Sequence, residues 1–261
     1  MAEVVIVESP AVAGEIIAQS LRELIEESPA AVLGLATGST PMPIYRALAL
    51  NLAADPLDMS AVRVFSLDEY VGLPSGHRES YHSVIARDVT VPLGLSPANV
   101  RVPNVDVAAL QGSGAEYERA IRVAGGVDIQ ILGIGRTGHL GFNEPGSSLA
   151  SLTRLKTLAP ETRADNARFF SSPEEVPLHC VTQGLGTILR ARHLILLATG
   201  EQKADAIAAA VEGPLTVSQP ASVIQLHPHV TVVLDEAAAS RLVNADYYRH
   251  AWANRPSWAR I

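Results

Sequence analysis

His139 and Glu144 lie five residues apart, beside four glycines that fall between residues 133 and 141. An imidazole held by a carboxylate can act as an acid or a base near neutral pH, because its unperturbed pKa is about 6.5. A lone histidine is more often structural than catalytic, but glycines let the backbone come close to a ligand. We therefore predict an acid–base site in this loop, with a structural histidine as the alternative.

Two acids, Asp68 and Glu69, follow an apolar run that predicts a strand over residues 62–67. Burying a carboxylate at the end of a strand costs free energy unless the group is paired or used, so one of the two is expected to face a site. A carboxylate there suits proton abstraction next to a carbonyl or an imine. The alternative is that both acids lie at a solvated strand end.

A glycine and hydroxyl turn, Gly38-Ser39-Thr40, stands immediately before Pro41, a favoured first residue of a helix. Free backbone N–H groups and the positive end of the helix dipole at such a turn would hold an anion such as a phosphate. The alternative is an ordinary helix cap by Ser39 or Thr40.

Two basic residues, Arg168 and Lys203, could complete an anion site. Lysine in the first turn of a helix opposes the helix dipole, so Lys203 at the start of a helix predicted over residues 201–211 suggests an anionic ligand. Taken alone, an exposed lysine is the simpler interpretation.

The spacing Gly133-x-Gly135-x-x-Gly138 matches a dinucleotide fingerprint. That fingerprint must open directly into a long helix. Here Gly138 is followed by further glycines, an asparagine and Pro145, a composition that does not form such a helix. The sequence therefore disfavours a nicotinamide cofactor.

The bulk composition is that of an ordinary globular chain of 261 residues, 48% hydrophobic, with a net charge of −7. The acidic balance disfavours nucleic acid or an anionic membrane as a partner. One cysteine excludes an internal disulfide and a cysteine-rich metal site. Neither a leader nor an apolar run of about 18 residues is found, so we expect a soluble, cytoplasmic protein.

Strands and helices alternate along the sequence. Strands are expected at residues 4–8, 31–36, 62–67, 127–133, 193–198 and 230–234, with a short β excursion at 154–158. Helices are expected at residues 10–27, 41–53, 80–89, 114–123, 161–170, 179–190, 201–211 and 236–242. This order predicts an α/β fold with a doubly wound, mostly parallel sheet and helices on both faces. We expect one domain over residues 1–244 and a C-terminal tail over 245–261.

Seven stretches carry a family resemblance, in this order: GLATGSTP at 34–41, LDEYVGLP at 67–74, SYHS at 80–83, LGIGRTGHLGFNEP at 132–145, SSLAS at 147–151, NARFF at 166–170 and GEQK at 200–203. Together they resemble the glucosamine-6-phosphate deaminase (glucosamine/galactosamine-6-phosphate isomerase) family. The resemblance implies a Rossmann-like sheet shared with ribose-5-phosphate isomerase and 6-phosphogluconolactonase. It also implies the conversion of glucosamine 6-phosphate and water to fructose 6-phosphate and ammonia, without a redox cofactor or an essential metal.

The resemblance assigns roles to matching positions. Asp68 would move a proton between C2 and C1 of the opened sugar, and His139, oriented by Glu144, would assist ring opening. The phosphate would be held by the 38–40 turn with Arg168 and Lys203. Tyr70 would shape the sugar pocket.

Thr137 departs from the family pattern, which usually has Asp or Asn two residues before this histidine. An acid there would favour the charged imidazole. Threonine can form hydrogen bonds but cannot supply that charge, so we predict a more readily neutral imidazole and an altered or reduced rate. The departure also admits a different phosphosugar as the substrate.

Four more residues match positions that bind the activator N-acetylglucosamine 6-phosphate between subunits of a hexamer in some family members: Ser147, Ser148, Arg154 and Lys156. The alternative is that Arg154 and Lys156, which alternate along a short strand, form one solvated face. Other relatives are monomers, so a homo-oligomer is one of two expectations.

Two rival functions remain. A sugar-phosphate sensor of the same fold would not need Asp68 or Glu144 and would normally carry a DNA-binding helix-turn-helix, for which no basic N-terminal segment is found. A lactonase of the related fold would not need the proton transfer by Asp68. Release of ammonia from glucosamine 6-phosphate separates all three.

Overall fold

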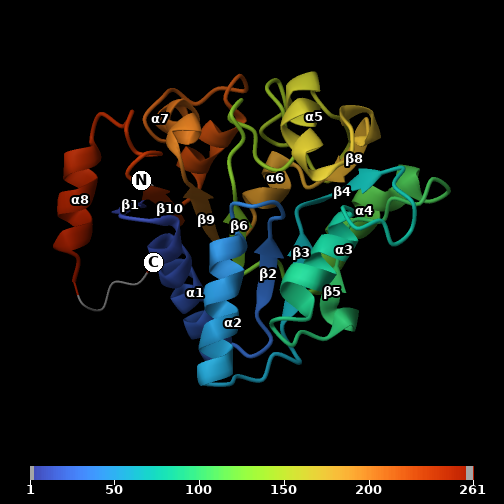
Figure 1. Cartoon of the computed structure of the whole chain (residues 1–261), viewed down its shortest axis with the longest axis horizontal. Coiled ribbons are helices and arrows are strands. Elements are labelled where there is room, and N and C mark those ends of the chain that lie inside the picture. The colour runs from blue at the N-terminus through green and yellow to red at the C-terminus, as the bar shows by residue number, and fades with distance from the viewer. Residues whose placement is uncertain (1–2, 257–260) are drawn as a thin grey trace.

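The computed structural model describes residues 3–256 and 261 (Figure 1). Seven strands form one sheet in the order β1-β10-β9-β6-β2-β3-β5, and every pairing within it is parallel. Their bounds are β1 Glu3–Val7, β2 Val32–Leu35, β3 Arg63–Ser66, β5 Val100–Arg101, β6 Ile129–Leu132, β9 His193–Ala198 and β10 Val230–Asp235. The predicted doubly wound parallel sheet is confirmed, and β5 adds an edge strand in a stretch where neither a strand nor a helix was expected.

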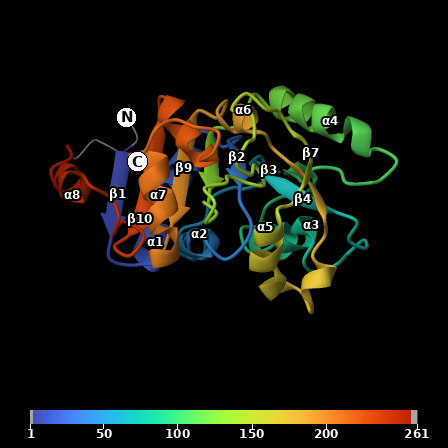
Figure 2. The same cartoon turned by 90° about the horizontal axis from the view of Figure 1, so that it is seen from above.

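Helices cover both faces of this sheet (Figure 2). One face is covered by α1 (Pro10–Glu27), α2 (Met42–Ala54) and α3 (Tyr81–Ile85), and the other by α4 (Leu110–Val123), α6 (Leu185–Ile188) and α7 (Ala204–Val211). The α3 helix continues as a π-helical turn, Ala86–Thr90. Among the described residues, no helix combines the length and the apolar character needed to cross a membrane.

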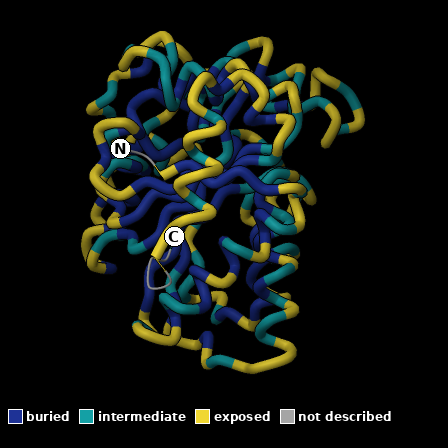
Figure 3. Tube along the Cα trace, turned by 90° about the vertical axis from the view of Figure 1, so that its left-hand side faces the viewer, coloured by how far each residue is buried: buried dark blue, intermediate teal, exposed yellow. Residues whose placement is uncertain are grey.

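Alternation along the strands divides the core into two clusters, one for each face. In β9, Leu194 and Leu196 belong to one cluster, while Ile195 and Leu197 belong to the other, and all four are fully buried. Successive side chains of a strand point to opposite faces, so a strand covered on both sides is apolar at every position. Figure 3 shows this buried centre with exposed segments around it.

A second sheet of three antiparallel strands lies beside the first, in the order β4-β8-β7. Its strands are β4 (Asp68–Val71), β7 (Arg154–Thr157) and β8 (His179–Thr182). The predicted β excursion at 154–158 is confirmed. The predicted helix at 179–190 is wrong over its first part, because β8 pairs with strands on both sides and only Leu185–Ile188 is helical.

The predicted helix at 236–242 is also wrong, because residues 236–241 form successive turns. The Asp235 carboxylate accepts hydrogen bonds from the backbone of Ala238, at 2.8 Å, and of Gly200, which ties this segment to a neighbouring loop. The chain becomes helical later, in α8 (Ala245–Ala253), which lies beside the edge strand β1 (Figure 1). Residues 257–260 of the expected tail lie outside the described residues.

Candidate active site

A cavity of about 840 Å³ opens at the carboxyl edge of the main sheet. Its walls come from the segments that follow β2, β3, β6 and β9 and from the segment around α5 (Pro160–Asn166). Loops at this edge are where open parallel sheets bind ligands. The cavity brings together eight of the predicted site residues: Gly38, Ser39, Thr40, Asp68, Tyr70, His139, Arg168 and Lys203. Thr137 and Glu144 lie behind the imidazole and contact it.

The turn before α2 has the geometry of an anion site. Gly38 adopts a φ of +85°, which glycine reaches without steric cost. The helix cap is Pro41, and no side chain caps the first turn, so the alternative of a cap by Ser39 or Thr40 is not observed. At this end of α2 the N–H groups of Met42 and Ile44 donate to the carbonyls of Ser39 and Pro41, and Pro43 has none. The N–H groups of the 38–40 turn have no acceptor among the described residues, so they are the ones that a ligand at the dipole's positive end would meet.

Basic groups stand at the same cavity. Burial lowers the pKa of Lys203, and although Asp165 opposes that shift, Arg168 and Arg136 add to it. Arg168 lies in a 3₁₀ turn (Ala167–Phe169) that follows α5, with its guanidinium 4.8 Å from the centre of the Phe169 ring. A bound anion would favour the charged lysine, so this group of cations complements a phosphate.

Asp68 begins β4 and is only 5% exposed. Burial and the adjacent Glu69 carboxylate raise the pKa of Asp68 well above its usual range. Among the described residues, no donor forms a hydrogen bond with this carboxylate. A Cβ at Gly141 would lie 3.3 Å from the Asp68 carboxylate and 2.9 Å from the Thr182 hydroxyl, so glycine lets the central loop pack closely here. The carboxylate is thus buried, facing the cavity and free to accept a proton.

Glu69 plays a different part from its neighbour. Its carboxylate accepts hydrogen bonds from the backbone N–H groups of Tyr70, Tyr81 and His82, at 2.7 to 2.9 Å. Burial raises the pKa of Glu69, and the three backbone donors oppose that shift. Of the two predicted acids, Asp68 lines the cavity, and Glu69 holds the start of α3 instead.

The glycines of the central loop leave room for the side chain of His139. A Cβ on Gly135 would lie 2.1 Å from Cε1 and Nε2 of His139, so the imidazole rests directly on this backbone. Gly138, with a φ of +74°, turns the chain before the histidine, and turns rather than a helix follow it. The loop thus lacks the helix that a dinucleotide fingerprint requires.

Thr137 links His139 to Glu144. Its hydroxyl donates to Oε2 of Glu144 at 3.2 Å and lies 2.9 Å from Nδ1 of His139, which is 3.4 Å from the same carboxylate oxygen. Because the hydroxyl proton points to Glu144, its oxygen can accept from an Nδ1–H, and this tautomer leaves Nε2 able to accept a proton. Burial raises the pKa of Glu144, but hydrogen bonds from His139, Thr162 and Thr137 outweigh burial and hold that pKa below its usual value.

Sequence reasoning missed three contacts made by α5. Thr162 donates to Oε1 of Glu144, Asn166 donates to the Tyr70 hydroxyl at 2.9 Å, and Asp165 forms an ion pair with Arg136. The four-residue spacing of Thr162 and Asn166 places both on one face of a helix, which is the signal that could have revealed them.

The four predicted activator residues lie away from this cavity. Ser147 is buried, with no hydrogen-bond partner for its hydroxyl among the described residues, and Ser148 is exposed. Arg154 and Lys156 are half-buried on β7 while Leu155 between them is exposed, so the face that the two basic residues share is only partly solvated. Arg154 instead donates to the buried Asn143 side chain of the central loop at 2.8 Å.

The anion-binding turn and the acid–base groups meet at the carboxyl edge of a parallel sheet, so the fold and the site define an α/β enzyme that binds a small anionic molecule there. A family model described as "Glucosamine-6-phosphate isomerases/6-phosphogluconolactonase" matches residues 8–233. The chain belongs to this family.

Relatives match along the full length. The chain is 56% identical over 260 residues to a glucosamine-6-phosphate deaminase of Streptomyces avermitilis, covering 99% of this chain and 100% of the relative. It is 55% identical over 272 residues to one of Bifidobacterium longum subsp. infantis, covering 100% of both. A solved structure described as a monomeric glucosamine-6-phosphate deaminase superposes with a TM-score of 0.89 at 38% identity, covering 92% of this chain and 100% of that one. A 6-phosphogluconolactonase from Trypanosoma cruzi superposes with a TM-score of 0.74 at 23% identity, covering 93% and 97%, and shows the fold alone.

Proposed function

We propose that this protein converts glucosamine 6-phosphate and water to fructose 6-phosphate and ammonia, the activity named for its relatives of 55–56% identity. The observation that carries the proposal is Asp68, a buried carboxylate that has no hydrogen-bond donor within residues 3–256 and lines the same cavity as the Gly38–Thr40 turn and Lys203. A proton acceptor at a fixed distance from a phosphate site can act on a carbon near the other end of a sugar phosphate.

Asp68 would carry the proton of the isomerisation. In the open-chain sugar it takes the proton from C2, the electron pair forms a C1–C2 double bond, and the C1 carbonyl oxygen takes a proton from water to give an enol. Asp68 then gives its proton to C1, and the electron pair of the amine nitrogen forms a protonated imine at C2. Water adds to that imine and ammonia leaves, which gives the ketone of fructose 6-phosphate. The direction in which the pKa of Asp68 is shifted suits this step, because a carboxylate with a raised pKa is a stronger base toward a carbon-bound proton.

His139 would open the ring. With its proton on Nδ1, held by Thr137 and Glu144, its Nε2 can accept the proton of the C1 hydroxyl and pass it to the ring oxygen. The ring rests on Gly135, so its position is set by the backbone. The phosphate would be gripped by the 38–40 turn with Arg168 and Lys203, which orients the sugar for both steps.

The proposed substrate is a phosphosugar, and a cytoplasmic location is part of the same proposal. Two assembly states are open: a monomer, as in the solved relative described as monomeric, and a homo-oligomer. Light scattering of the purified protein distinguishes them.

The decisive experiment measures ammonia and fructose 6-phosphate released from glucosamine 6-phosphate by the purified protein, beside hydrolysis of 6-phosphogluconolactone. We expect the two products in equal amounts and no lactone hydrolysis above background. Asp68→Asn keeps the shape of the side chain but cannot accept the proton, so kcat should fall by about 10²- to 10⁴-fold. The lactonase activity would be assigned instead if the wild type released no ammonia but hydrolysed the lactone, and if that hydrolysis survived in Asp68→Asn.

A further inference from the structure

The Glu144 carboxylate is held from two elements at once. Oε2 is bonded by the hydroxyl of Thr137, which lies in the same loop. Oε1 is bonded by the hydroxyl of Thr162, which lies on α5 and is 3% exposed. Two hydroxyl donors on the two oxygens fix the rotation of the carboxylate, and the hydrogen bonds are strong because the acceptor is charged.

We propose that Thr162 is a positioning residue of the reaction: its hydroxyl holds Glu144 in the orientation that keeps His139 ready at the substrate. This inference rests on the proposed function and adds a residue to it. Without the hydroxyl, Oε1 would lose the one donor it has among the described residues, and a buried carboxylate oxygen without a donor is costly. The carboxylate could then turn, and the link through Thr137 to the imidazole would loosen.

The location of Thr162 ties the acid–base pair to the rest of the site. The same short helix carries Asn166, which bonds the Tyr70 hydroxyl, and leads directly into the turn with Arg168. In the part of the chain that the structure describes, the titratable groups that interact electrostatically with Glu144 include His139, on the same loop, and Cys180, on β8. The α5 group that contacts Glu144 is the Thr162 hydroxyl, which does not titrate. Removing this hydroxyl therefore takes a hydrogen bond from the carboxylate without removing a charged group from the site.

The test compares Thr162→Val, which keeps the shape and removes the donor, with Thr162→Ser, which keeps the donor. Ammonia release from glucosamine 6-phosphate is measured as kcat and KM across pH. We expect Thr162→Val to lower kcat by about 10- to 100-fold, the effect of losing a hydrogen bond to a charged group, with KM within about twofold. The acid side of its pH profile should move to higher pH, because Glu144 then ionises less readily. Thr162→Ser should stay within about threefold of the wild type, and so should the exposed neighbour Glu161→Gln.

Three results would overturn the proposal. In the first, Thr162→Val keeps the wild-type kcat and pH profile. In the second, its KM rises while kcat is unchanged, which would mean that the hydroxyl serves the substrate. In the third, Thr162→Ser is as impaired as Thr162→Val. Thermal melting verifies folding, and Thr162→Ala replaces Thr162→Val if the valine variant does not fold.

A measurement independent of turnover separates this inference from the proposed function. Nuclear magnetic resonance of the imidazole nitrogens reports the tautomer of His139 in the free protein. Thr162→Val should change the His139 nitrogen shifts, and Thr162→Ser should not. If the wild type releases no ammonia but this change is seen, the proposed function fails and the positioning contact stands. If the wild type is active and neither kcat nor the shifts respond, only the positioning contact fails.

Discussion

Thr137 orients the imidazole without adding a charge beside it. The hydroxyl lies 2.9 Å from Nδ1 of His139 and donates to Glu144 at 3.2 Å, so one small side chain connects the two. An aspartate in this position would also orient the ring, but its charge would favour the protonated imidazole. Threonine can therefore orient His139, the proposed base, without stabilising its charged form.

The variant Thr137→Asp tests this separation. The added carboxylate should favour the charged imidazole, so a base that must be neutral becomes available only at higher pH. We expect the acid side of the kcat/KM profile to move upward by about one to two pH units, measured by ammonia release. Thr137→Ser keeps the hydroxyl and should leave the profile in place. An unmoved profile in Thr137→Asp would reject a role for the missing charge.

Single residues at strand ends were predictable because a parallel sheet gathers its carboxyl ends at one edge. Asp68 and His139 both stand just after apolar runs, and the cavity brings them together. Thr162 was not predictable from its type, since threonine is common on helix surfaces. Its role depends on a contact with Glu144, 18 residues earlier, that only the folded chain creates.

At the scale of elements, the small sheet explains the main error of prediction. Residues 179–182 (His-Cys-Val-Thr) are a run of only four residues, and such short runs do not separate strand from helix by periodicity. The choice is made by pairing: β8 has β4 on one side and β7 on the other. The same pairing positions two of the predicted site residues, because β4 begins with Asp68 and β7 begins with Arg154.

Arg154 joins β7 to the central loop, and its replacement tests whether this strand supports the site. Its guanidinium donates to Asn143, whose own amide group donates to Leu140 and Gln183. We expect Arg154→Ala to lower kcat about fivefold without any activator present, because the loop loses one hydrogen-bond donor. Leu155→Ala, on the exposed face of the same strand, is the matched control. If Arg154→Ala keeps the wild-type basal rate and changes only the response of the rate to N-acetylglucosamine 6-phosphate, Arg154 is a purely regulatory residue.

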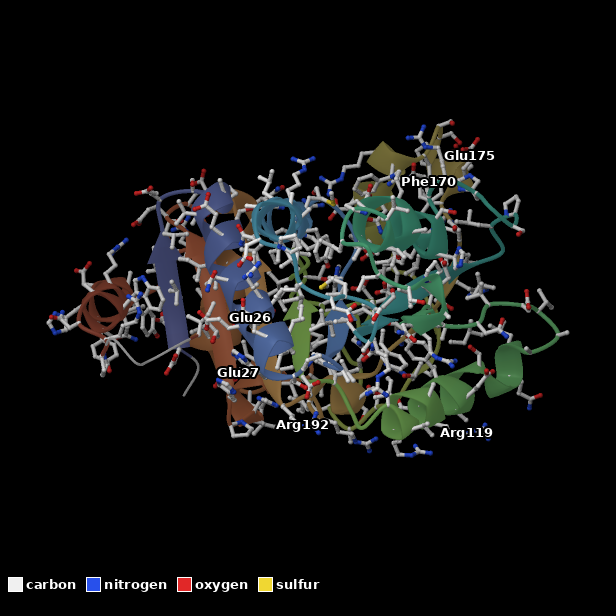
Figure 4. The ribbon with its side chains drawn as sticks, turned by 90° about the horizontal axis from the view of Figure 1, so that it is seen from below. Glu26, Glu27, Arg119, Phe170, Glu175 and Arg192 are labelled. Atoms are coloured by element: carbon white, nitrogen blue, oxygen red, sulfur yellow. The ribbon has the colours of Figure 1, made fainter. Side chains whose placement is uncertain are left out.

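At the scale of the whole molecule, the two edges of the main sheet differ in chemistry. The carboxyl edge holds the cavity, with its cations and acids. Figure 4 views the opposite side and labels Arg192, the residue before β9, with Glu26 and Glu27 of α1. Near that edge the rings of His193 and His229 stack with centroids 3.6 Å apart and planes within 5°. A charge on His193 would lie against the neighbouring imidazole at this distance, so the contact favours a neutral His193.

This histidine pair makes the stability of the fold depend on pH. Burial, with the neighbouring His229 and His227, lowers the pKa of His193 to about 3. The unfolded chain binds a proton there near pH 6.5, whereas the folded chain does not, so the stability contributed by neutral His193 is present above that pH and is lost as pH falls toward 3. The loss should approach about 1.4 kcal/mol per pH unit. His193→Gln, which can still bond the Thr231 hydroxyl 2.9 Å away, should flatten the decline of the melting temperature in acid, while the exposed His250→Gln should not. Equal acid sensitivity in the wild type and His193→Gln would assign the decline to other groups.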